Sequence, residues 1–102
     1  MGNEMRADQA CQALASGKCI EVRYDGFGRV VEVHAVGRST AGNPVMRVWQ
    51  VEGGSASNNR VGWKLMRLDE TQFIGATDRI SEAPRDGYKR GDRGMSTVDC
   101  EI

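Results

Sequence analysis

Apolar and polar residues alternate along most of the chain, and the period of the alternation changes once, at Gly17. Before that glycine, four small or apolar residues recur at helical spacing: Ala7, Ala10, Cys11 and Leu14. This spacing predicts a short amphipathic helix from about Glu4 to Ala15. Gly17 stands where a helix commonly ends in the left-handed conformation.

Beyond Gly17 the pattern has a period of two, which is typical of strands with one buried face. In the first strand, Ile20, Val22 and Tyr24 alternate with Glu21 and Arg23. In the second strand, at 28–38, Val31, Val33 and Ala35 are expected on the face opposite Glu32, His34 and Val36. Further strands are predicted at 45–51, 62–67 and 72–76, with a tight turn at 68–70.

One helix followed by five short antiparallel strands predicts a mainly β (α+β) fold. Closing the sheet into a small barrel, or nearly so, would hide strand edges that so small a sheet could not otherwise protect. The chain is expected to be a single domain with a helix at 1–17, a barrel at 18–77 and an extended tail at 78–102. A short strand is predicted near 98–102.

Composition restricts the function without identifying it. The 102 residues are 39% hydrophobic and 27% charged, with 14 basic and 14 acidic side chains, so no overall field favours a long polyanion. No stretch is long or apolar enough for a membrane span or a signal peptide. The three cysteines are interpreted as reduced thiols of a cytoplasmic protein. With one histidine and no paired cysteines, we expect neither a metal site nor a cofactor.

Two tryptophans beside basic residues are the main candidates for ligand binding. Alternation places Arg47 and Trp49 on the same face of the third strand, while Trp63 and Lys64 lie on the fourth. An indole next to a guanidinium can stack on a base and capture an anion. The alternative is that both indoles are core aromatics and the basic residues lie on a solvated surface.

The linker between these strands and the C-terminal tail supply further candidates. Gly53 to Ser57 could offer backbone amides and hydroxyls to an anion, although a flexible hairpin connection is an equal alternative. The tail carries a basic segment, Pro84 to Gly94, that could fold over the ligand. The candidate ligand-binding residues are Arg47, Trp49, Ser55, Ser57, Trp63, Lys64, Arg67, Tyr88, Lys89 and Arg90.

Catalysis has little support in the sequence. His34 is the sole imidazole, and Glu32 lies two residues away on the same predicted strand face. A nuclease or phosphodiesterase using His34 as a base would also need a nucleophile or metal-binding carboxylates. Neither is present in a suitable pattern, so we expect a protein that is not an enzyme and in which His34 is structural.

The chain resembles the WYL-domain family, in the small stand-alone version found in bacteria and phages. Val48-Trp49-Gln50 occupies the position of the Trp-Tyr-Leu triplet and keeps its central aromatic residue, and Met66 to Asp69 resembles a later segment of the family. The closing segment, Gly87 to Met95, is also similar. The resemblance implies a five-stranded Sm-like (Src-homology-3-type) barrel that binds a nucleotide or single-stranded nucleic acid. It also implies that Trp49, Arg47 and Arg67 line the pocket.

These observations predict a regulatory or sensor module that binds a nucleotide or single-stranded nucleic acid. In a phage, the same chemistry would make an anti-defence protein, as a nucleotide sponge or a protein inhibitor. A protein-interaction module that uses the tryptophan-bearing face is the other alternative. A homo-oligomer assembled through strand edges is expected in each case.

Overall fold

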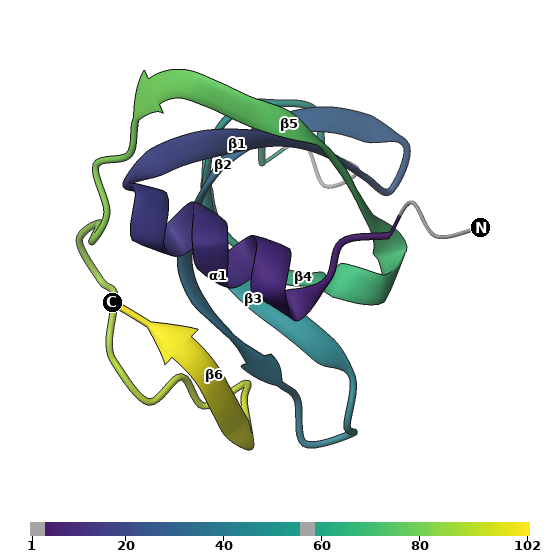
Figure 1. Ribbon diagram of the computed structural model, residues 1–102, viewed down its shortest axis with the longest axis vertical. Helices are drawn as coiled ribbons and strands as arrows, with labels where there is room; N and C mark the ends of the chain where they lie inside the picture. Colours follow the sequence, from purple (N-terminus) through teal and green to yellow (C-terminus); the bar gives the residue numbers. More distant parts are fainter. Residues whose placement is uncertain (1–3, 56–58) are drawn as a thin grey trace.

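The alternating stretch forms a single antiparallel sheet, and the N-terminal segment forms one helix beside it (Figure 1). The computed structural model describes residues 4–55 and 59–102. The elements are α1 (Ala7–Ser16), β1 (Lys18–Tyr24), β2 (Phe27–Arg38), β3 (Pro44–Gly53), β4 (Gly62–Arg67), a 3-10 turn η1 (Leu68–Glu70), β5 (Thr71–Ile80) and β6 (Thr97–Glu101). The mainly β class and the single N-terminal helix are confirmed, and Gly17 ends α1 in the left-handed conformation (φ 71°).

The long strand β2 organises the sheet, whose order is β4-β3-β2-β1-β5. Its first half pairs with β1 and its last residues pair with β6, while β3 runs along its other edge. The path ends at β4 and β5 without closing, so within the described residues the sheet has six strands and is not a closed barrel. The predicted C-terminal strand is confirmed as β6.

A register shift in β2 reverses its faces near His34. Val33 is paired with Val48, but the next ladder pair joins Ala35 to Arg47, which leaves His34 outside the ladder with β3. The extra residue turns the rest of the strand over. The predicted alternation was therefore wrong beyond His34, because Ala35 shares a face with Arg47 and Val36 points into the core.

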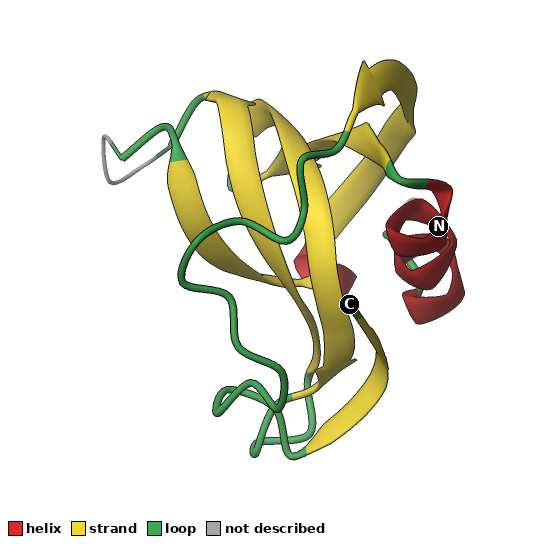
Figure 2. Cartoon of the chain, turned by 90° about the vertical axis from the view of Figure 1, so that its left-hand side faces the viewer, coloured by secondary structure: helices red, strands yellow, loops and turns green. Residues whose placement is uncertain are grey.

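The two faces of the sheet are covered differently (Figure 2). Helix α1 covers one face, where Ala10 and Ala13 complete the main apolar core. The 81–96 connection between β5 and β6 runs over the opposite face, which we call the outer face, and it buries Ala35 and Val45 beneath Met95 and Tyr88. No helix among the described residues is long and apolar enough to cross a membrane.

The prediction of three reduced thiols was wrong for two of them. Cys11 of α1 and Cys100 of β6 form a disulfide across a sequence separation of 89 residues, and only Cys19, which is buried, is free. Sequence spacing gave no sign of this pairing, because it depends on β6 returning beside α1 along the edge of β2.

Candidate ligand-binding site

The aromatic residues of the outer face form one cluster. Trp49 and Trp63 are directly opposite in the β3–β4 ladder, and their ring centroids lie 5.3 Å apart in an edge-to-face arrangement. His34 contacts Trp63 at 4.7 Å, and Tyr88 of the tail lies 6.2 Å from Trp63. Both indoles are half-buried, so the alternative in which both are core aromatics does not describe them.

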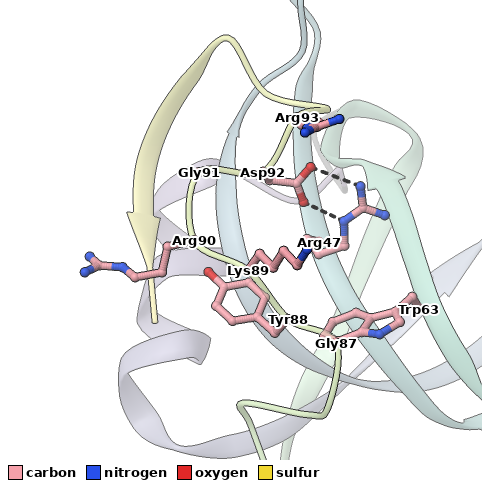
Figure 3. Close-up of a pocket in the computed structure, with 9 residues that line it drawn as sticks. All are labelled: Arg47, Trp63, Gly87, Tyr88, Lys89, Arg90, Gly91, Asp92 and Arg93. Atoms are coloured by element: carbon pink, nitrogen blue, oxygen red, sulfur yellow. Dashed lines mark hydrogen bonds and ion pairs between the residues drawn. The ribbon is translucent and has the colours of Figure 1, made fainter.

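The tail meets this cluster and borders an open pocket of about 740 Å³ (Figure 3). Arg47 and Trp63 line it from the sheet, and the other seven of its nine lining residues form one continuous run, 87–93. We call this run the cationic loop. The sheet therefore provides one aromatic and one basic wall, and the loop provides most of the polar groups.

Arg47 is already paired inside the pocket. Its Nε and Nη2 donate to the two carboxylate oxygens of Asp92 at 2.6 and 3.1 Å, and Asp92 also accepts from the Gly94 N–H at 2.8 Å. The hydrogen bonds from Arg47 lower the pKa of Asp92 below its usual 3.8. Since Arg47 uses its bidentate edge on Asp92, it positions the cationic loop rather than presenting that edge to a ligand.

The remaining cations of the loop are more accessible. The lining residues carry four positive side chains (Arg47, Lys89, Arg90 and Arg93) and one negative side chain (Asp92), a local balance of 4 − 1 = +3. Arg90 points towards β6, where Glu101 lies 3.5 Å away (Figure 3). Lys89 and Arg93 are exposed, and within the described residues neither has an ion-pair partner. These two side chains are the groups best placed to attract an anion.

A buried polar network holds the start of the tail against the outer face. The Glu32 carboxylate, with only 1% of the side chain exposed, accepts from Arg85 Nε at 2.8 Å and Nη2 at 3.1 Å, and from the Glu82 N–H at 2.8 Å. The Arg85 guanidinium also lies over the Trp49 ring at 5.3 Å. Burial by itself would raise the pKa of Glu32, but these hydrogen bonds lower it below 4.5.

His34 completes this network as a neutral imidazole. The Arg85 N–H donates to Nε2 at 3.1 Å, so Nδ1 carries the proton and donates it to the Glu32 carbonyl at 3.0 Å. Burial lowers the pKa of His34 below its usual 6.5. With both ring nitrogens engaged inside the protein, His34 has no lone pair directed at a substrate.

Stability is expected to fall as the pH drops below about 6.5, because the unfolded chain takes up a proton that buried His34 resists. If Nε2 were protonated, two donors, Nε2–H and the Arg85 N–H, would face each other. The positive ring would also be repelled by the Arg85 guanidinium, and the Glu32 carboxylate would offset part of this repulsion. One proton limits the slope to about 1.4 kcal/mol per pH unit. Urea unfolding at pH 7.5 and 5.5 measures this change in unfolding free energy. The unfolding free energy of His34→Asn should not change over the same range. An equal pH dependence in that variant would show that His34 is not its source.

The structure brings five of the ten predicted ligand-binding residues to the pocket: Arg47, Trp63, Tyr88, Lys89 and Arg90. Trp49 lies beside it, beneath Arg85. Arg67 is elsewhere, paired with Asp69 at 2.6 Å and Glu70 at 3.6 Å. Lys64 is opposite Val48 in the ladder and donates to Ser55 Oγ at 3.1 Å. Neither Lys64 nor Ser55 is among the residues that line the pocket. Ser57 lies outside the described residues.

Sequence reasoning missed Arg93 and Asp92 in the pocket and Arg85 over the Trp49 ring. All three belong to the basic segment at 84–94, whose charge was the available signal, but no pattern indicated which side chains face the sheet. Among the described residues, no group of three His, Cys, Asp or Glu side chains could hold a metal ion.

No family model, curated protein or solved structure matches this chain. The resemblance to the WYL-domain family and its Sm-like barrel therefore stays a prediction. What the pocket binds has to be argued from its own geometry and charge.

Proposed function

We propose that this domain is a non-enzymatic module that binds a nucleotide, or the end of a short single strand, in the pocket under the cationic loop. The observation that carries the proposal is the placement of exposed Lys89 and Arg93 around a pocket walled by Trp63 and Tyr88. Cationic groups suit the phosphates and aromatic surface suits the base.

Size and charge favour a small ligand over a long polyanion. A volume of about 740 Å³ lies within the range of small-molecule sites. The chain is neutral overall, with 14 basic and 14 acidic side chains, so the attraction is confined to the pocket and its rim. We assign this module a regulatory or sensor role in the cytoplasm, which agrees with the resemblance of the sequence to the WYL-domain family.

A protein-interaction module is the second candidate, because apolar side chains are exposed beside the pocket. Leu65 of β4 and Val61 just before it are 38% and 55% exposed, and β4 is an edge strand of the sheet. A protein partner or a second copy of the chain could add a strand there. Binding at that edge would not depend on Lys89 or Arg93, which separates the two candidates.

Titration with ATP, monitored by tryptophan fluorescence, tests nucleotide binding. The same titration with a thymidine hexamer tests binding of a short single strand. Lys89→Ala and Arg93→Ala are each expected to weaken ATP binding about tenfold or more, the loss of one charge-assisted hydrogen bond. Arg67→Ala removes an equal charge outside the pocket and should leave the affinity unchanged. Absence of binding by the unmodified protein, or an equal loss in all three variants, would overturn the proposal.

A further inference from the structure

The cationic loop depends on β6 for its position. The Glu101 carboxylate accepts from the Gly91 N–H at 3.1 Å and lies 3.5 Å from Arg90 Nε. Both contacts join the last residue of β6 to the middle of the loop. The loop contains neither a helix nor a strand. Its course depends on side-chain contacts to the sheet, which Asp92 makes with Arg47, Tyr88 with the His34 carbonyl and Glu101 with the Gly91 N–H.

Non-covalent contacts join β6 to the sheet over a short length. The strand is five residues long, and Thr97, Val98 and Asp99 are all exposed. It pairs with β2 on one side over Ala35–Arg38, with a register shift inside that short ladder. Exposed strand ends with few buried contacts open at low free-energy cost.

The disulfide supplies the covalent link that β6 otherwise lacks. Cys100 is the neighbour of Glu101 and is bonded to Cys11 of α1, with a Cα–Cα distance of 6.0 Å. Helix α1 is in turn packed into the main core through Ala10 and Ala13. Cys11 and Cys100 are each partly exposed, so a thiol in solution can approach the bond.

We propose that the Cys11–Cys100 disulfide controls the ligand pocket: its reduction releases β6 and, through Glu101, loosens the cationic loop and weakens binding. The inference rests on the proposed nucleotide function. A dithiol is the reductant, since one of its thiolates attacks a cysteine sulfur and its second thiol resolves the mixed disulfide. The dithiol is oxidised to a disulfide by two electrons, and the protein gains two cysteine thiols. Cytosolic disulfides are usually transient or redox-sensing, as this role requires.

ATP affinity of the oxidised protein and of the protein reduced with dithiothreitol gives the first test. Reduction is expected to weaken ATP binding about fivefold or more, the lower range of coupling between sites, and reoxidation is expected to restore it. Cys11→Ser should bind as weakly as the reduced protein and should not respond to dithiothreitol. Cys19→Ser keeps the disulfide and should respond as the unmodified protein does.

Amide hydrogen exchange gives a second readout that needs no ligand. The peptide spanning 87–93 should exchange faster after reduction, while β3 should be unchanged. If ATP binds equally well to both redox states, or if exchange in the loop does not change, the redox inference is overturned and the proposed function stands. If the oxidised protein does not bind ATP, the proposed function is wrong, and the inference that the disulfide regulates ATP binding is wrong as well.

Discussion

The Arg85→Ala variant is expected to lose about 3–5 kcal/mol of unfolding free energy, because it leaves a buried carboxylate without its counter-ion. Glu32 is 1% exposed and receives two of its hydrogen bonds from the Arg85 guanidinium. After the substitution, the donors left to the carboxylate among the described residues are the Glu82 N–H and the weak Cys19 thiol. Urea unfolding at pH 7.5 measures the loss.

Arg79→Ala is the matched control for this prediction. Arg79 pairs with Glu52 at 2.7 Å, but the two side chains are 48% and 62% exposed. Exposed pairs of this kind contribute about 0–1 kcal/mol, so the control should stay close to the unmodified protein. Similar losses in the two variants would show that burial of Glu32 is not the source of the effect.

The pH dependence of Arg85→Ala gives a further check. In the unmodified protein, Glu32 has a lowered pKa, so its contribution is complete above about 4.5 and is lost as the pH falls below that value. In the variant, burial acts without the opposing guanidinium and raises the pKa of Glu32. The difference in stability between the two proteins should therefore shrink in acid, and a difference that stays constant down to pH 4 would contradict this account.

Strands with one buried face were predictable because apolar and polar residues alternate along them, as in β1. The first strand kept its expected faces, and β4 has the predicted bounds. The prediction failed where the period was interrupted without a sequence signal. The bulge at His34 has no glycine or proline to mark it, yet it places Ala35 beside Arg47 and moves Val36 into the core.

The candidate site was only partly predictable, because its contacts join segments that are distant in the sequence. The sequence placed Trp49 and Trp63 on consecutive strands, and the β3–β4 ladder sets them directly opposite each other, a register that was not predicted. Asp92 meets Arg47 across 45 residues, and no periodicity in the tail indicates the match. Arg67 was also predicted to bind the ligand, but it is paired with Asp69 and Glu70 and is not among the residues that line the pocket.

If the proposed ligand binds in the pocket, we expect its binding and the stability of the protein to be coupled through the tail. Arg85 and His34 hold its beginning, Arg47 holds its middle through Asp92, and β6 holds its end. Contacts in the buried network therefore belong to the scaffold of the pocket, while Lys89 and Arg93 remain accessible to a ligand. Substitutions in the first group should change both stability and affinity, and substitutions in the second group should change affinity alone.

Gly37→Ala is expected to lose roughly 2–3 kcal/mol of unfolding free energy, the upper part of the range for overpacking, because rigid backbone opposes the new methyl group. A Cβ at Gly37 would collide with the carbonyl oxygen of Thr97 and would meet the Val98 Cα at 3.0 Å. It would therefore push β6 away from β2, with the cationic loop following, so ATP affinity should fall as well.

Gly75→Ala is the control, since this glycine also lies in a strand and a Cβ added there would meet nothing within 4 Å among the described residues. Replacing a strand glycine at an unobstructed position is neutral or slightly stabilising. Thermal unfolding and ATP titration of both variants compare the two sites directly. If Gly37→Ala were as stable as Gly75→Ala and bound ATP equally well, close packing of β6 against β2 would not contribute to holding the loop.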